Sequence, residues 1–134
     1  MFSGRSKVSR KVMFPVVSSI WETKLFSVLD ESTLTTLCKK ANIDLEQQKA
    51  DMHFAIHPGG PKIIDYVIDA VGLKKEQANW SYEILRRYGN MSSATIPHIF
   101  NEIVNDPKIV SGTKIVAMAF GPGLTATGLL LEKL

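Results

Sequence analysis

The spacing of apolar residues along the chain predicts strands that alternate with helices. Residues 12–26 are rich in β-branched and aromatic side chains, which favours a strand, and Pro15 would place that strand at an edge or a bend. Ser32 and Thr33 then precede apolar residues at helical spacing, which predicts a short helix with a hydroxyl cap. The polar residues 42–50 are predicted to form a connection.

A second strand is predicted over residues 52–57, where side chains alternate between two faces. Its faces carry Phe54 and Ile56 on one side, and His53, Ala55 and His57 on the other. After a Pro-Gly-Gly-Pro turn, apolar residues recur at helical spacing from Ile63 to Val71. Gly72 is expected to end this amphipathic helix.

Two more helices follow in the predicted order. Residues 76–87 form the first, which residues 88–90 interrupt. Ser92 or Ser93 is expected to cap the second, whose apolar positions extend to Val104.

The C-terminal part is predicted to be a hairpin of two strands, residues 114–120 and 124–131, around Gly121, Pro122 and Gly123. The element order is then strand, helix, strand, three helices and two strands. This order fits an α/β domain that has a mixed β-sheet with helices packed on it.

The charge pattern favours no polyanionic partner. The net charge is +3, from 16 Lys and Arg against 13 Asp and Glu. The basic residues occur in dispersed pairs with acids close by and no interleaved aromatic residues, which is typical of a solvated face. The longest apolar run, residues 115–120, is far too short to cross a bilayer. We therefore expect neither a nucleic acid nor a membrane as partner.

Residues 1–11 are predicted to be a basic leader, disordered, ahead of a single domain over residues 12–134. No acid precedes Glu22, a pattern that a frayed leader and an organelle transit peptide share. Cys38 is the one cysteine, so an intramolecular disulfide and a cysteine-type zinc site are both impossible. A reducing compartment, the cytoplasm, is the expected location.

The first candidate site is the motif HPGGP at residues 57–61. A histidine at a strand end, before a rigid turn and a helix, lies where α/β sheets place ligands. The backbone N–H groups of Gly59 and Gly60 could approach a phosphate or an oxyanion, and the helix N-terminus adds partial positive charge. A strand-to-helix turn with a buried, hydrogen-bonded histidine fits the same residues.

Two later motifs also have a glycine-controlled backbone. YGNMSSA at residues 88–94 contains Asn90, which could cap a helix or donate a hydrogen bond to a substrate carbonyl. FGPGLT at residues 120–125 is typical of a tight turn between strands. His53 and His98 lack metal-ligand spacing to each other or to an acid, so we expect structural roles for them and no metal site.

Together, HPGGPKI, RYGNMSSA and AFGPGLT, in this order, resemble the C-terminal domain of the chalcone and stilbene synthase family, the type III polyketide synthases. The resemblance extends from about His53 to the C-terminus. The β-ketoacyl carrier-protein synthases of type III share a histidine and an asparagine in equivalent places, but their histidine loop continues differently. The implied fold is the C-terminal half of a thiolase-like fold.

The resemblance implies catalytic roles for His57 and Asn90. In this family a cysteine, a histidine and an asparagine meet in a buried pocket. When a malonyl thioester loses carbon dioxide, negative charge builds on the thioester oxygen, and two fixed donors would stabilise it. An imidazolium at His57 would also lower the pKa of a nearby cysteine. No cofactor is implied, because acyl-CoA and malonyl-CoA are substrates.

The resemblance also implies a set of pocket residues. Gly59 and Gly60 would lie near the coenzyme A arm, and the walls of the acyl pocket would include Ser92, Gly121, Pro122 and Gly123.

The family's nucleophilic cysteine belongs to the N-terminal half of the fold, upstream of the residues that match. Cys38 lies on a predicted helix face without a strand-to-helix elbow, so we expect it to pack rather than react. The expected partners are therefore an N-terminal thiolase-fold half that carries the cysteine, further copies of this chain, and acyl-CoA.

The expected function is the His/Asn part of a type III polyketide synthase that condenses malonyl-CoA onto an acyl-CoA starter. Three other functions fit the sequence: a catalytically inactive remnant, a module that binds acyl-CoA or oligomerises, and a function like that of the β-ketoacyl carrier-protein synthases of type III.

Overall fold

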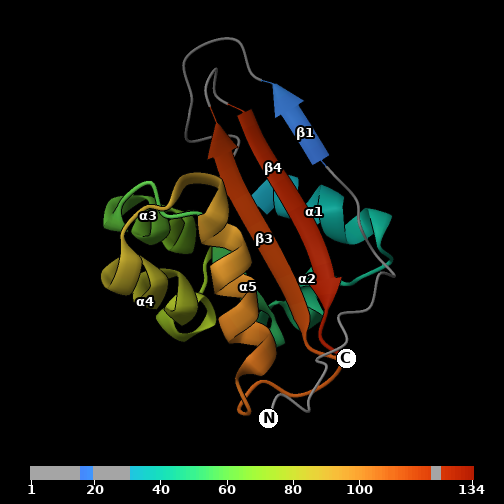
Figure 1. Cartoon of the computed structure of the whole chain (residues 1–134). Coiled ribbons are helices and arrows are strands. Elements are labelled where there is room, and N and C mark those ends of the chain that lie inside the picture. Colours follow the sequence, from blue (N-terminus) through green and yellow to red (C-terminus); the bar gives the residue numbers. More distant parts are fainter. Residues whose placement is uncertain (1–15, 20–30, 122–124) are drawn as a thin grey trace.

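The computed structural model describes residues 16–19, 31–121 and 125–134 (Figure 1). The predicted leader over residues 1–11 lies outside the described residues, as do Pro122 and Gly123. Of the strand predicted over residues 12–26, the structure describes β1 (Val16–Ser19).

A mixed sheet with the strand order β1-β4-β3-β2 forms the middle of the molecule. Its central strand β3 (Lys114–Gly121) pairs antiparallel with β4 (Thr125–Glu132) and parallel with β2 (His53–Ile56). β1 pairs antiparallel with the other edge of β4. The predicted hairpin is confirmed, with Gly121 opposite Thr125, and so is the mixed sheet.

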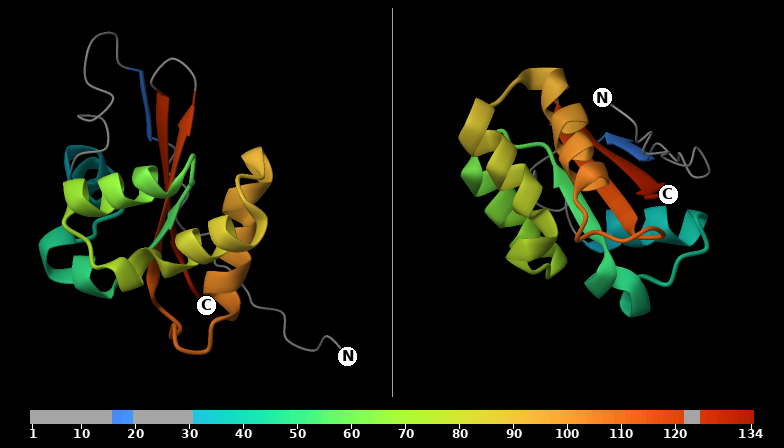
Figure 2. Two further views of the ribbon diagram at one scale, coloured as in Figure 1. Left: turned by 90° about the vertical axis from the view of Figure 1, so that its left-hand side faces the viewer. Right: turned by 60° about the horizontal axis from the view of Figure 1, so that its bottom comes forward.

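Helices cover both faces of this sheet. α1 (Glu31–Lys40) and α3 (Pro61–Val71) lie on one face and α5 (Thr95–Asn105) lies on the other, as the left view of Figure 2 shows. α4 (Asn79–Tyr88) crosses the edge formed by β2. None of the helices in the described ranges has the length and apolar character that crossing a membrane requires.

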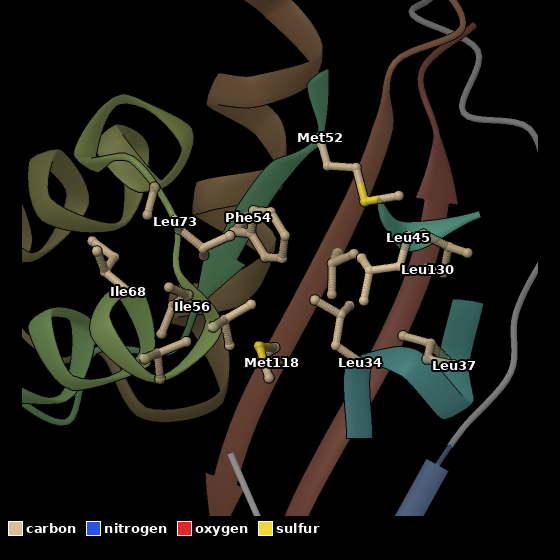
Figure 3. Close-up of a cluster of buried hydrophobic side chains, with 14 of the residues drawn as sticks. Leu34, Leu37, Leu45, Met52, Phe54, Ile56, Ile68, Leu73, Met118 and Leu130 are labelled. Carbon is tan, nitrogen blue, oxygen red and sulfur yellow. The ribbon is translucent and has the colours of Figure 1, made fainter. Parts of the chain in front are cut away.

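The two faces of β2 pack into two separate cores, as the alternation of its residues predicts. Phe54 and Ile56 belong to the core under α1 and α3, where Phe54 lies in the middle of the labelled side chains of Figure 3. Ala55 belongs to the core under α5, together with Ile99 and Ile103. Because both faces are buried, the three residues between the two histidines are all apolar.

Helix α3 ends where the sequence predicts, and it begins at Pro61, the last residue of the predicted turn. Pro61 occupies its first turn, where a missing N–H removes no helical hydrogen bond. Gly72 caps the C-terminus with φ 68°, a left-handed conformation that glycine adopts without steric cost. The N–H of Leu73 then donates to the carbonyl of Ile68 at 2.9 Å and closes the helix end.

Three local predictions are wrong. Ser32 and Thr33 do not precede the first helix as its cap, because α1 already begins at Glu31. The connection predicted over residues 42–50 contains a helical turn, α2 (Leu45–Gln48), followed by a 3-10 turn, η1 (Lys49–Asp51). Asp44 Oδ1 accepts the Gln47 N–H at 3.3 Å and caps α2, while Leu45 is buried.

The serine cap predicted for α5 is also absent. Ser92 lies within a 3-10 turn, η3 (Ser92–Ala94), and Ala94 occupies the N-cap position of α5. Instead, the Thr95 hydroxyl accepts the Met91 N–H at 2.9 Å. A buried threonine one residue inside the helix therefore holds the preceding loop.

Candidate functional site

His57 lies directly after β2, at the carboxyl end of the strand. Its backbone N–H donates to the carbonyl of Met118 at 2.8 Å, which extends the pairing of β2 with β3 by one bond. The side chain is half-buried, and burial lowers the pKa of its imidazole below the ordinary value. At neutral pH the ring is therefore mainly neutral and carries one N–H donor and one acceptor nitrogen.

Asn90 begins the loop that follows α4. The helix ends at Gly89, whose φ of 71° suits glycine, and whose N–H donates to the carbonyl of Leu85 at 2.8 Å. The Asn90 side chain is exposed, and its Oδ1 accepts the Ser92 N–H at 2.8 Å. This bond fixes the amide oxygen toward the loop and leaves Nδ2 as the end available to another acceptor.

Ser92 has a strained backbone at this point. Its φ is 55°, in the left-handed region that costs a non-glycine residue roughly 1–2 kcal/mol. The hydrogen bonds from Ser92 N–H to Asn90 and from Met91 N–H to Thr95 hold the loop in this conformation. Strain of this kind is concentrated at functional sites.

A pocket of about 420 Å³ opens beside His57. Three elements contribute its walls, in addition to His57: the start of α5 with the loop before it, the end of β3, and β4. Its other residues are Ser92, Ser93, Ile96, Pro97, Ala117, Ala119, Phe120, Thr127 and Leu129. The pocket is therefore apolar apart from one imidazole and three hydroxyl groups, a composition suited to an acyl chain with a few polar anchors.

The structure brings His57 and Ser92 together in this pocket, while other predicted residues lie elsewhere. Asn90, Gly59 and Gly60 do not line it. Gly121 ends β3, next to the lining residue Phe120.

The sequence interpretation missed the wall that β3, β4 and α5 provide. Ala117 and Ala119 alternate along β3, and Thr127 and Leu129 alternate along β4, all on the side of the sheet that α5 covers. The period-two pattern could have found them. Ile96 is found only once α5 is packed beside those strands.

His53 and His98 lie in other surroundings. His53 and His57 have three residues between them, and four steps along an extended chain place their Cα atoms about 13 Å apart at the usual rise per residue. His53 lines different pockets, together with Glu76 and Lys108. His98 lies in α5, and its Nδ1 lies 2.9 Å from the carbonyl oxygen of Ala94 at the N-cap of that helix. Across the described ranges, no group of three or more His, Cys, Asp or Glu side chains could hold a metal ion.

Cys38 is buried in α1, in the core under α1 and α3. Ala117 and Leu129 of the pocket belong to the other core, on the opposite face of the sheet. Burial raises the pKa of the Cys38 thiol, which disfavours the reactive thiolate.

Acid is expected to destabilise this domain through its half-buried histidines. Burial lowers the pKa of both His53 and His57. At His53 the negative charge of Asp106 opposes this lowering of the pKa, and the positive charge of Lys133 adds to it. Unfolded histidines, with an ordinary pKa of about 6.5, bind protons more readily, so the free energy of unfolding should fall as pH drops below about 6.5.

Urea unfolding at about pH 7.5 and about pH 5.5 measures this loss, on either side of the ordinary histidine pKa. The double variant His53→Gln/His57→Gln should lose less stability on acidification than the original chain. Equal losses in both chains would contradict the assignment.

The family model described as "Chalcone and stilbene synthases, C-terminal domain" matches residues 22–134. The chain is 39% identical over 80 residues to the alpha-pyrone synthesis polyketide synthase-like Pks18 of Mycobacterium tuberculosis, covering 59% of this chain and 20% of that protein. It is 32% identical over 116 residues to a putative chalcone synthase of Bacillus subtilis, covering 80% of this chain and 32% of that protein. The type III polyketide synthase A of Arabidopsis thaliana is 35% identical over 111 residues, which cover 78% of this chain and 28% of that protein.

Among solved structures, the fold is similar to the C-terminal type III polyketide synthase domain of Steely1, a type I/III hybrid from Dictyostelium. The TM-score is 0.77 at 23% identity, over 91% of this chain and 40% of that domain. The match to these curated relatives thus spans a fifth to about a third of their length. The chain belongs to the chalcone and stilbene synthase family, the type III polyketide synthases, and it matches their C-terminal domain.

Proposed function

We propose that this chain supplies the histidine and asparagine donors of a type III polyketide synthase site, in which malonyl-CoA is decarboxylated and condensed onto an acyl-CoA starter. The observation that carries the proposal is the position of His57, which is half-buried and lines an apolar pocket at the carboxyl end of β2. A neutral imidazole there can donate to a thioester oxygen while the acyl chain occupies the apolar walls.

The chemistry needs donors aimed at one oxygen. As the bond between the carboxylate and the α-carbon of malonyl-CoA breaks, its electron pair moves toward the thioester carbonyl and carbon dioxide leaves. The enolate carbon then attacks the starter thioester, and the thiolate that carried the starter departs. His57 and the Nδ2 end of Asn90 would stabilise the charge on the enolate oxygen.

The geometry of the Asn90 loop supports a donor role for its side chain. Its oxygen is already held by the Ser92 N–H, so the amide cannot rotate freely. Among the described residues, no hydrogen bond occupies Nδ2. A fixed donor contributes more to catalysis than a rotating one, because no orientation has to be frozen at the moment of reaction.

The open space around Gly60 supports a close approach of another molecule to the turn between β2 and α3. The φ of Gly60 is 177°, an extended conformation open to any residue, and an added Cβ would meet nothing within 4 Å. The packing of the described chain therefore does not require glycine at this position. A coenzyme A arm lying against the backbone would require it.

We also propose that the nucleophile comes from an N-terminal thiolase-fold half, because the buried thiol of Cys38 is unsuited to attack. A thiolate placed near His57 would raise the imidazole pKa, since the ion pair stabilises the charged ring. The same pair would lower the pKa of the cysteine.

Combining this chain with a separately produced N-terminal half of a family member tests the proposal. We expect the mixture to release carbon dioxide from malonyl-CoA faster than the sum of its two parts. The same N-terminal half with its cysteine replaced by alanine is the control for the condensation product. A mixture no faster than that sum would count against the proposed function.

The buried Cys38 favours one alternative, an acyl-CoA-binding module that holds its ligand without reaction. Isothermal titration with acetyl-CoA and malonyl-CoA distinguishes the two functions. Binding heat without decarboxylation by the mixture would support the module, and absence of heat would remove it.

A further inference from the structure

Among the described residues, the outer edge of β2 has no neighbouring strand, and a serine hydroxyl takes the place of one. β2 is the last strand in the sheet order that residues 16–19, 31–121 and 125–134 form, and within these ranges it pairs with β3 alone. On its outer side, the Ile56 N–H donates to Ser81 Oγ at 2.9 Å, and Ser81 Oγ donates to the Phe54 carbonyl at 3.4 Å. Ser81 lies in α4 and is 0% exposed.

The residue that follows this bridge is His57. Its own N–H is bound on the inner side by the Met118 carbonyl, while the preceding N–H is bound on the outer side by Ser81. The backbone that leads into His57 is therefore held from both sides. The direction of a side chain follows the orientation of its backbone.

Helix α4 also leads to the second candidate donor. It runs from Ser81 to Tyr88 without interruption, and Gly89 closes it immediately before Asn90. A continuous helix has a fixed rise of about 1.5 Å per residue. A contact between Ser81 and β2 therefore fixes where the Asn90 loop begins relative to His57.

We propose that Ser81 is a positioning residue for His57: its hydroxyl replaces a neighbouring strand at the edge of β2 and aligns the imidazole with the loop of Asn90. The inference rests on the proposed function, which gives the orientation of His57 its importance. Ser81 itself does not line the pocket and so takes no direct part in the reaction.

Gln77 provides a matched control at the other end of the same edge. Its Nε2 donates to the carbonyl of Met52 at 2.9 Å and to that of Lys49 at 2.7 Å, and its side chain is also buried. Both residues connect the segment around α4 to the segment of β2 through a buried side chain. Gln77 bonds to residues just before the strand, at the end opposite to His57.

The test compares Ser81→Ala, Ser81→Thr and Gln77→Ala by NMR, through amide hydrogen exchange at Ile56 and pH titration of the His57 ring. In Ser81→Ala we expect exchange at Ile56 to become about tenfold faster or more. We also expect the His57 titration midpoint to rise toward that of a solvated imidazole. Ser81→Thr, which keeps the hydroxyl, and Gln77→Ala should leave the His57 titration unchanged.

If Ser81→Ala fails to fold, Ser81→Cys, which keeps the size and weakens the hydrogen bonds, takes its place. An unchanged His57 titration in the Ser81 variant would overturn the proposal, as would an equal change in Gln77→Ala. These readouts need no enzymatic activity. Failure of the mixed halves to decarboxylate malonyl-CoA would therefore contradict the proposed function and leave the role of Ser81 intact.

Discussion

Replacing His57 with alanine is expected to slow malonyl-CoA decarboxylation about 100-fold or more in the complex with an N-terminal half, since one lost donor to a developing oxyanion typically costs 10²–10³ in rate. Alanine offers no hydrogen-bond donor to that oxygen, and it also cannot become an imidazolium that stabilises a cysteine thiolate. Acyl transfer to the cysteine should therefore be slowed further than decarboxylation. The two steps are measured by release of carbon dioxide and by mass spectrometry of the acylated cysteine.

The matched control for this variant is His53→Ala. His53 is also half-buried and also lies on the face of β2 that carries His57, but it lines other pockets. Its replacement should leave both rates within about threefold of the original, as is usual for residues that do not touch reacting groups. Equal losses in the two variants would mean that the histidines act through stability, and would contradict the role of His57.

Replacing Phe54 with alanine is expected to lower the free energy of unfolding by about 3–5 kcal/mol. Phe54 is 0% exposed and lies among side chains from α3, β3 and β4, so its removal leaves a cavity that the surrounding helices cannot fill. A loss of this size is comparable with the whole stability of a small domain, about 5–15 kcal/mol. Urea unfolding followed by circular dichroism measures it.

Tyr88→Ala is the control, because Tyr88 is another large aromatic side chain but is 57% exposed. Its replacement should change stability by less than about 0.5 kcal/mol, as is usual for surface positions. If Phe54→Ala does not fold, Phe54→Leu should still show a measurable loss of about 1 kcal/mol. A Phe54 variant as stable as the Tyr88 variant would contradict the packing of this core.

The local structure of the chain followed closely from its sequence. The alternation in β2, the helical spacing in α3 with Gly72 after it, and the hairpin around Gly121 each depend on neighbours a few residues apart. Sequence patterns report such short-range geometry directly. Two of the exceptions, α2 and the cap of α5, depend on a buried Leu45 and a buried Thr95, whose burial only the complete fold produces.

The sequence also determined which residues carry the candidate chemistry. The motifs at His57 and Asn90 identified the family, and the family model and relatives then confirmed it. Motif identity specifies side-chain types, since only an imidazole and an amide offer those donors. It contains no information on which way each side chain turns.

Only the tertiary structure decided how these residues are held and what surrounds them. The pocket wall combines Ile96 from α5 with Ala119 from β3 and Leu129 from β4, so it exists only when the helix packs on the sheet. In the same way, Ser81 reaches the backbone of Ile56 across 25 positions of the sequence. Contacts of this range depend on the balance of packing over the whole domain, which no local spacing of residues encodes.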